Sequence, residues 1–449
     1  MMYWQLIALS TLIVSGQGWS SVKSYFNHNP SQRYTDPYRN IARNGDNLEQ
    51  VIVEQINTAK KSVFVAVQEL RLPLIASALI LKKNAGVDVR VVLEHDYNFT
   101  VLSQVDRSGD NEYEATKLDD LKAFVDLNRN GRIEKTELET RDAVYMLRQA
   151  GIPIMDDTAD GSGGSGLMHH KFVILDGKTV VTGTANFTMS CTHGDLLATG
   201  SRGNPNSLVV VQSAAMAKLF LEEFSQMWGN GKRGNFGHNK TYRGPQTVTV
   251  RGTKISVQFS PTSSRYTWEE TTNGLIALHL AKATQSVKAA LFVFSDQRLS
   301  DVLAKRHEAG AQMGVLIEPK FAFRYYSELL DMLGLRMLNA KCEYEPDNHA
   351  WKKPVTEAGM GVLARGDVLH HKFAVVDNKT TIVGSENWSD SANYTNDETL
   401  LVIQNVGISE QYTKEYNRLK QSSLLGPSAR IKTEIDRLET ACADQGLYF

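Results

Sequence analysis

Features that define several large protein classes are scarce in this chain of 449 residues. It has three cysteines, Cys191, Cys342 and Cys442, which lie far apart and form no Cys-x-x-Cys pair. The spacing therefore predicts neither a zinc knuckle nor a dithiol redox motif. At most one disulfide can form, and we expect buried free thiols rather than a disulfide framework.

An excess of charge is also lacking, because 49 Lys and Arg oppose 50 Asp and Glu for a net charge of −1. No global field then attracts a polyanion, which weighs against a protein built for non-specific DNA binding. Hydrophobic residues make up 42% of the chain and charged residues 22%, which is typical of a globular protein rather than a disordered or multi-span membrane protein. The length predicts two domains of about 200 residues.

One short apolar run, Leu6 to Val14, stands near the N-terminus and is interrupted only by Ser10 and Thr11. It is too short to span a bilayer, and it suits the h-region of a signal peptide. No Lys or Arg precedes it, so a retained N-terminal anchor is the alternative. We expect a signal peptide over residues 1–20 and a secreted or periplasmic protein.

The rest of the chain is a duplication. "AKKSVFVAVQEL" and "ATQSVKAALFVF" begin at Ala59 and Ala283, and "GVDVRVVLE" and "GAQMGVLIE" end at Glu94 and Glu318. Both pairs share one offset of 224 residues (283 − 59 and 318 − 94). Each half alternates strands and helices, which predicts βαβ units and a sheet covered by helices. The predicted strands and helices are strand 62–70, helix 72–85 and strand 87–93 in the first half, and strand 287–294, helix 299–309 and strand 313–317 in the second.

The most specific repeat is the pair "LMHHKFVILDGKTVVTGTANF" and "VLHHKFAVVDNKTTIVGSENW". In the second copy His370 and Lys372 share one face of a strand, and His371 points to the other. Asp377 ends this strand at a turn, and the returning strand ends at Asn387. A tight hairpin would bring imidazole, ammonium, hydroxyl and amide groups together at one end.

The first copy places the same residue types at His169, Lys171, Asp176 and Asn186. Groups that donate hydrogen bonds suit a phosphate, whose oxygens gain charge during transfer. Two such hairpins set one histidine on each side of a phosphorus, so that one attacks and the other protonates the leaving oxygen. A zinc site is disfavoured because an ammonium lies beside each histidine and no Cys or carboxylate has ligand spacing.

The two H-x-K-x4-D segments resemble the signature of the phospholipase D superfamily over nearly the whole chain after residue 20. The resemblance implies an α/β fold of two pseudo-symmetric α/β/α sandwich domains that share one central active site. It also implies a phosphohistidine intermediate without a catalytic metal or cofactor, with His169 as nucleophile and His370 as acid. By resemblance, the phosphoryl group is bound by His169, Lys171, Asn186, His370, Lys372 and Asn387, while Asp176 and Asp377 brace the hairpins.

Family members usually place an acid after the second hairpin to orient a histidine. Glu398 fits that role here, and Asn206 is its counterpart in the first half. An imidazole backed by a carboxylate has a higher pKa than one backed by an amide. We therefore expect Glu398 to support His370 as the general acid.

The first half carries an insertion near residues 101–140 that contains "DLNRNGRIEKTE". This stretch matches the EF-hand loop pattern D-x-[DN]-x-[DN]-G-x5-E at every position. We expect it to bind a structural Ca²⁺ weakly, the alternative being a surface turn between helices. The predicted ligands are Asp126, Asn128, Asn130, the carbonyl of Arg132 and Glu137.

These observations predict an N-terminal domain over 21–228, a linker over 229–250 and a C-terminal domain over 251–449. The linker is basic, and we favour a solvated linker over a groove for a polyanion. The predicted function is a phospholipase D-type phosphodiesterase that hydrolyses or transfers the head groups of phospholipids. A secreted or periplasmic nuclease of the same mechanism is the alternative, and a degenerate Ca²⁺-binding scaffold is disfavoured because both motifs are intact. Both motifs lie in one chain, so we expect a monomer that contacts membrane surfaces transiently.

Overall fold

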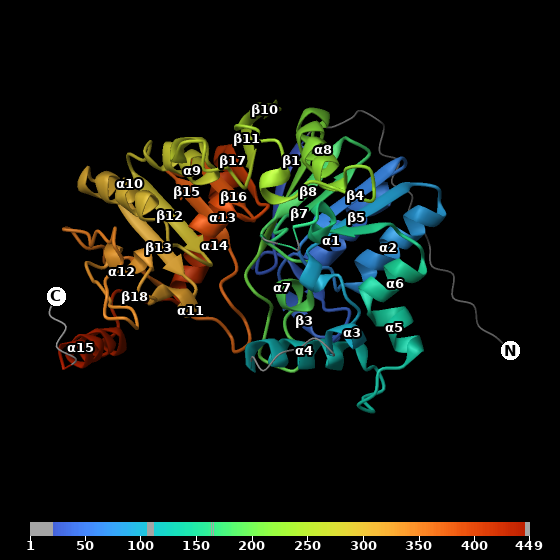
Figure 1. The fold of residues 1–449 in the computed structure, drawn as a ribbon, viewed down its shortest axis with the longest axis horizontal. Coiled ribbons are helices and arrows are strands. Elements are labelled where there is room, and N and C mark those ends of the chain that lie inside the picture. The colour runs from blue at the N-terminus through green and yellow to red at the C-terminus, as the bar shows by residue number, and fades with distance from the viewer. Residues whose placement is uncertain (1–20, 106–111, 163, 165, 445–449) are drawn as a thin grey trace.

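The computed structural model describes residues 21–105, 112–162, 164 and 166–444. The predicted signal peptide, residues 1–20, lies outside the described residues. The chain forms two lobes side by side, each built around one sheet (Figure 1). In the part of the chain that is described, no helix is both long and apolar enough to cross a membrane.

The N-terminal lobe contains a seven-stranded sheet in which β4, β5 and β6 are parallel neighbours and the other pairs are antiparallel. Across the sheet the strands are β1 (Ser21–Phe26), β9 (Ser207–Gln212), β8 (Thr179–Gly183), β7 (Lys171–Leu175), β4 (Ser62–Val67), β5 (Asp88–Leu93) and β6 (Ile154–Asp156).

The C-terminal lobe repeats this order in a nine-stranded sheet. The strands are β10 (Gln246–Val250), β11 (Thr253–Phe259), β17 (Thr399–Gln404), β16 (Thr380–Gly384), β15 (Lys372–Val376), β12 (Ser286–Leu291), β13 (Gln312–Ile317), β14 (Ala358–Met360) and β18 (Leu424–Leu425). The duplication seen in the sequence is therefore a duplication of sheet topology. The strand β10 occupies the last residues of the range assigned to the linker.

Helices cover the outer face of each sheet and two more fill the space between the sheets. The outer helices are α1 (Leu48–Thr58), α2 (Pro73–Asn84) and α6 (Ala143–Gln149) in the first lobe, and α9 (Thr272–Leu280), α10 (Gln297–Glu308) and α12 (Glu328–Met332) in the second. The inner helices are α8 (Ala214–Trp228) and α14 (Val406–Gln421). This layering confirms the predicted α/β fold of two pseudo-symmetric sandwich domains.

The inner helices join the lobes through one shared hydrophobic core. Phe220 and Phe224 of α8 belong to the same buried cluster as Tyr412 and Tyr416 of α14. Ser213 and Asn405 cap the first turns of α8 and α14 with their side chains, so the two helices begin in the same way. Because one core spans both sheets, burial of apolar surface holds the lobes together.

The second part of the linker packs into the interface between the lobes, which corrects the expectation of a solvated segment there, while residues 229–233 are exposed. Phe236 is buried in the shared core. The side chain of Lys240 is also buried and pairs with Glu223 and with Asp397, its Nζ lying 2.7 Å from Asp397 Oδ1. Arg243 pairs with Glu223 as well. These cations neutralise buried carboxylates and are not available to a polyanion.

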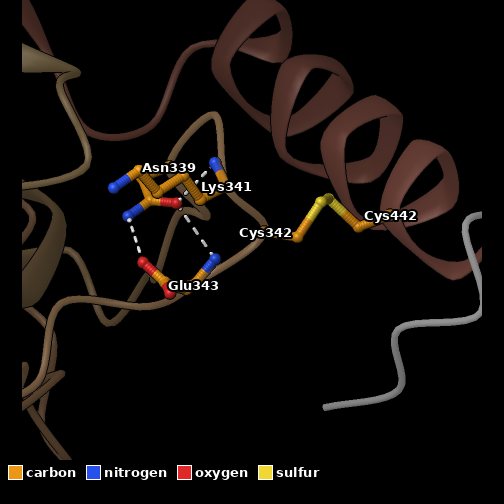
Figure 2. The surroundings of a disulfide bond; sticks show 5 residues. All are labelled: Asn339, Lys341, Cys342, Glu343 and Cys442. Atoms are coloured by element: carbon orange, nitrogen blue, oxygen red, sulfur yellow. Dashed lines mark hydrogen bonds between the residues drawn. A yellow bond between two sulfur atoms is a disulfide. The ribbon is translucent and has the colours of Figure 1, made fainter.

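The expectation of free cysteines is wrong for two of the three residues. Cys342 and Cys442 form a disulfide across a sequence separation of 100 residues, while Cys191 is free and buried. Figure 2 shows that the bond ties a loop braced by Asn339 to α15 (Ala429–Ala443). Spacing alone did not reveal this pairing because the partners meet only after the second lobe has folded.

The insertion packs on the core of the first lobe. It contains α3 (Val101–Val105), α4 (Glu112–Val125) and α5 (Lys135–Arg141). Phe124 and Val125 of α4 and Leu138 of α5 are buried in the cluster that also covers the outer face of the sheet. The predicted EF-hand loop joins α4 to α5.

Candidate active site

The first residues of each repeated hairpin reach across to the other lobe. His169 N donates to the carbonyl of Asp397 over 3.0 Å, and Asp397 N donates to the carbonyl of Leu167 over 2.8 Å. In the second half Val368 N donates to Asn204 Oδ1 over 2.8 Å. These crossed contacts bring the two H-x-K segments together at the boundary between the lobes.

The partners of the first histidine of each H-x-K segment are crossed in the same way. His169 Nδ1 lies 2.7 Å from Glu398 Oε2, and His370 Nδ1 lies 3.0 Å from Asn206 Oδ1. Glu398 therefore backs His169, which corrects the expectation that it backs His370. The repeat identifies Glu398 and Asn206 as counterparts, but the exchange of segments between lobes decides which histidine each one meets.

The hydrogen bonds around Asn206 define the tautomer of His370. Asn206 Nδ2 donates to the carbonyls of Cys191 and Asn204, and Asn206 Oδ1 accepts from Thr184 Oγ1. The oxygen therefore faces His370, so Nδ1 of the imidazole carries a proton. In both histidines Nδ1 is thus engaged, and Nε2 lies on the other side of the ring.

A lysine stands two residues after each histidine, at the first position of β7 or β15. Lys171 Nζ donates to the carbonyl of His169 over 2.6 Å, and Lys372 Nζ donates to the carbonyl of His370 over 2.8 Å. Burial lowers the pKa of Lys171 to about 8, and burial together with Lys171 lowers the pKa of Lys372 to about 7. An anion between the ammonium groups would reverse these shifts.

Burial and the two lysines also hold the pKa values of both histidines well below 6.5. The exposed fractions are only 7% for His169 and 9% for His370. Glu398 opposes this effect at His169 because a carboxylate stabilises the imidazolium. Burial also raises the pKa of Glu398 to about 7, against the attraction of Lys171.

Gln68 is a site residue that the sequence reasoning missed. Its Oε1 accepts from Asn186 Nδ2 over 3.1 Å and lies 3.3 Å from Lys171 Nζ. Its counterpart in the second half is Phe292. The centroid of the Phe292 ring lies 4.8 Å from Lys372 Nζ and 5.2 Å from the centroid of the His370 ring. The offset of 224 residues relates the two positions and would have identified them. The first half of the site is thus polar at this position and the second is aromatic.

The remaining predicted residues divide between the site and its supports. Asn387 follows β16 as Asn186 follows β8, and each amide has an oxygen that is buried and has no hydrogen-bond partner among the described residues. An anion would not bind these oxygens, but a substrate hydroxyl or protonated phosphate oxygen would donate to them. Both amides therefore remain candidates for contact with substrate.

The two motif aspartates lie at the far ends of the hairpins. Asp176 accepts from the backbone N–H groups of Lys60, Lys61 and Ser62. Asp377 accepts from the corresponding N–H groups at 284–286. These bonds lower the pKa of both carboxyls and join each hairpin to the start of the neighbouring strand.

The second histidine of each pair points to the opposite face. His170 Nε2 lies 3.2 Å from Glu223 on α8, and His371 Nε2 lies 2.9 Å from Glu415 on α14. Both histidines are fully buried. They attach the inner helices to the hairpins and take no place in the site.

The EF-hand-like loop has the turn that its sequence predicts. Gly131 has φ +78°, and its N–H donates to Asp126 Oδ2 over 2.8 Å. Asn130 Oδ1 accepts from Arg132 N over 2.8 Å, and Glu137 folds back to accept from Leu127 N over 2.7 Å. Among the described residues no three His, Cys, Asp or Glu side chains form a cluster able to hold a metal; two donors of the predicted set are amides and one is a backbone carbonyl.

Residues 52–228 and 276–420 match a family described as cardiolipin synthase, phospholipase D-like domain. The chain belongs to this family. The two matched ranges correspond to the two lobes and include both H-x-K hairpins. The resemblance inferred from the repeated motif is therefore confirmed at the level of the family.

Individual relatives of this phospholipase D-like chain are distant. A mitochondrial cardiolipin hydrolase from Xenopus tropicalis is 24% identical over 170 residues, which is 38% of this chain and 56% of the relative. A phospholipase D from Rickettsia prowazekii is 25% identical over 173 residues, 38% of this chain and 58% of the relative. The chain thus spans somewhat more than half the length of these relatives.

One solved structure is similar to this chain over both lobes. The phosphatidylserine synthase of Haemophilus influenzae matches 89% of this chain and 92% of its own, with a TM-score of 0.53 and 12% identity. At this identity the likeness shows the fold alone.

Proposed function

We propose that the protein is a phospholipase D-type phosphodiesterase that hydrolyses, or transfers, the head groups of phospholipids through a phosphohistidine. The observation that carries the proposal is the crossed arrangement of His169 and His370. Each imidazole is held through Nδ1 by the other lobe, and each is followed by a buried lysine. This leaves two Nε2 atoms and two ammonium groups for one phosphodiester.

In the first step Nε2 of His169 bonds to phosphorus and the bond from phosphorus to the leaving oxygen breaks. His370, protonated when the anionic phosphate binds beside it, transfers its Nε2 proton to that oxygen. Glu398 stabilises the positive charge that His169 acquires. The family resemblance implies His169 as nucleophile, and the sequence predicts that Glu398 supports His370 as acid. In the structure Glu398 contacts His169 and Asn206 contacts His370, so the support for His169 as nucleophile is the carboxylate that stabilises its positive charge.

In the second step His370 takes a proton from water, or from an alcohol in transfer, and the oxygen bonds to phosphorus. The bond between phosphorus and His169 breaks, and its electron pair returns to Nε2. Lys171 and Lys372 stabilise the phosphoryl oxygens in both steps. The residues described here need no metal to complete this cycle.

A lipid substrate is favoured over a nucleic acid. The curated relatives include cardiolipin hydrolases and phospholipases D by name. The basic linker had supported the nuclease alternative, but two of its four cations, Lys240 and Arg243, are engaged by Glu223. Of the four, only Lys232 and Arg233 are exposed, which weakens the support of that segment for a polyanion substrate.

The test is a parallel assay of phosphatidylcholine, cardiolipin and plasmid DNA with wild-type protein and His169→Asn. We expect release of head group or lipid product by the wild type and a loss of at least about a thousandfold in the variant. Cleavage of DNA without turnover of lipid would replace this proposal with the nuclease.

We further propose that the loop between α4 and α5 binds Ca²⁺ in a structural role. Oxygens of Asp126, Asn128, Asn130 and Glu137 and the carbonyl of Arg132 fit the donor preference of this ion. Titration calorimetry should show a heat of Ca²⁺ binding, with low affinity, that is absent from Glu137→Gln. The control variant Glu139→Gln, which changes an exposed residue of α5, should show the same heat as wild type. Equal heats for wild type and Glu137→Gln would remove the site.

Export to a secreted or periplasmic location is also part of the proposal. The disulfide between Cys342 and Cys442 supports it, since such bonds persist in oxidising compartments. A monomer is proposed because both halves of the site come from one chain. Fractionation of expressing cells and light scattering of the purified protein test these two points.

A further inference from the structure

The segment 319–326, which we call the aromatic–basic loop, differs from the rest of the surface near the site. It follows β13, contains α11 (Pro319–Ala322) and reads "PKFAFRYY", with two cations, four aromatic rings and no acid. Lys320, Arg324 and Tyr325 are exposed, Tyr325 to 39%. Figure 1 places α11 at the lower edge of the C-terminal lobe.

Ring contacts connect this loop to the catalytic centre. The ring centroids of Phe321 and Phe292 lie 4.9 Å apart, and those of Phe292 and His370 lie 5.2 Å apart. Glu318, directly before the loop, accepts from Leu369 N over 2.7 Å. The loop therefore adjoins the second H-x-K segment in space although about 50 residues separate them, since 370 − 321 = 49.

The inner side of the loop is held by the C-terminal helix. Phe323 packs against a buried cluster of Leu330, Met337 and Ile431, the last from α15. The disulfide at Cys442 ties the same helix to the lobe (Figure 2). With one side anchored, Arg324 and Tyr325 are directed to solvent.

The counterpart of the loop in the first half, 224 residues earlier, is built differently. Residues 95–102 read "HDYNFTVL" and carry Asp96 and no Lys or Arg. Asn98 in this segment donates to Asp156 over 2.8 Å and accepts at its carbonyl from Arg148 over 2.7 Å. Of these two segments, only the second copy presents cations together with an exposed aromatic ring, that of Tyr325.

We propose that the aromatic–basic loop is the surface through which the protein docks on a phospholipid bilayer that carries anionic lipids. Tyrosine and phenylalanine rings partition to the boundary between head groups and acyl chains, and cations beside them are attracted to anionic head groups. The loop leads from this boundary through Phe292 to His370. The inference rests on the proposed lipid substrate and names the part of the protein that meets the bilayer.

Co-sedimentation with vesicles tests the surface separately from the chemistry. Vesicles of phosphatidylcholine alone or with phosphatidylglycerol are titrated into wild type and into Arg324→Gln/Tyr325→Ser. The matched control, Lys232→Gln/Leu81→Ser, removes an exposed cation of the linker and an exposed apolar side chain of the outer helix α2. We expect the loop variant to bind mixed vesicles about tenfold more weakly than wild type, and the control to bind within about twofold. Raised salt should weaken the binding of wild type.

A soluble diester, bis(p-nitrophenyl) phosphate, reports on the paired histidines without a bilayer. The loop variant should lose about tenfold more activity on mixed vesicles than on this diester. Equal binding by the loop variant and wild type, or no binding by wild type, overturns the docking surface, while diester hydrolysis still supports the proposed chemistry. Loss of single-stranded DNA binding with unchanged vesicle binding would assign the loop to nucleic acid instead.

Discussion

Replacing Glu398 with glutamine should slow the enzyme while leaving the geometry of His169 nearly intact. Glutamine keeps an oxygen that accepts from Nδ1 but lacks the negative charge. The bond from Nδ1 to Oε2 is 2.7 Å long and Glu398 has no exposed surface, so little water screens the charge. A hydrogen bond to a charged group contributes about 1.5–3 kcal/mol. If the whole of this free energy stabilises the transition state, in which His169 becomes positive, its loss lowers kcat about 10- to 150-fold.

The pH profile gives a second measure of the same contact. Burial raises the pKa of Glu398 to about 7, and the ionised form is the one that supports His169. The wild-type rate should therefore fall as the pH decreases through about 7, and this acidic limb should disappear in Glu398→Gln. Initial rates on the soluble diester between pH 5 and 9 measure both effects.

Glu415→Gln is the matched control for this change. It alters another buried carboxylate that contacts a histidine, since Glu415 lies 2.9 Å from His371 on the opposite face. We expect it to lower the free energy of unfolding and to leave the pH profile unchanged. A Glu398→Gln protein with kcat within twofold of wild type and the same acidic limb would refute the role assigned to Glu398.

Three further changes test the supports of the site. Asp377→Asn should lower the free energy of unfolding by about 1–3 kcal/mol, because the carboxylate accepts three backbone N–H groups. Since these bonds lower its pKa, the contribution is present at neutral pH and is lost in acid, so urea unfolding of variant and wild type should converge as the pH falls. Cys442→Ser should lower the free energy of unfolding by about 2–4 kcal/mol, and a reducing agent should do the same to wild type but not to the variant. Gln68→Ala should reduce kcat/KM about tenfold through loss of its contacts with Lys171 and Asn186, with unfolding near that of wild type; full activity would show that Gln68 does not organise the site.

The sequence predicted much of this architecture because the duplication is explicit in it. The strands predicted at 62–70 and 287–294 are β4 and β12, and the helices that follow are α2 and α10. Alternation along the strands also predicted that His169 and Lys171 share a face. Both predictions use local periodicity, which can be read from one sequence without any knowledge of tertiary contacts.

What the sequence did not predict depends on contacts between distant segments. The pairing of Glu398 with His169 requires the segment near Asp397 to cross between the lobes. The disulfide and the burial of Lys240 likewise depend on residues that meet only in the folded protein. Gln68 was accessible through the repeat offset but carries no motif of its own.

The central claim is that the two H-x-K segments form one site in which His169 is the nucleophile. Rapid quenching in base during turnover of labelled bis(p-nitrophenyl) phosphate, followed by peptide mass spectrometry at alkaline pH, tests it most directly. We expect a base-stable, acid-labile adduct on His169 in wild type and none in His169→Asn. The amount should be larger in His370→Asn, because p-nitrophenolate leaves without a proton from His370 whereas the attacking water still needs His370 as base. An adduct on His370 that persists in His169→Asn would contradict it.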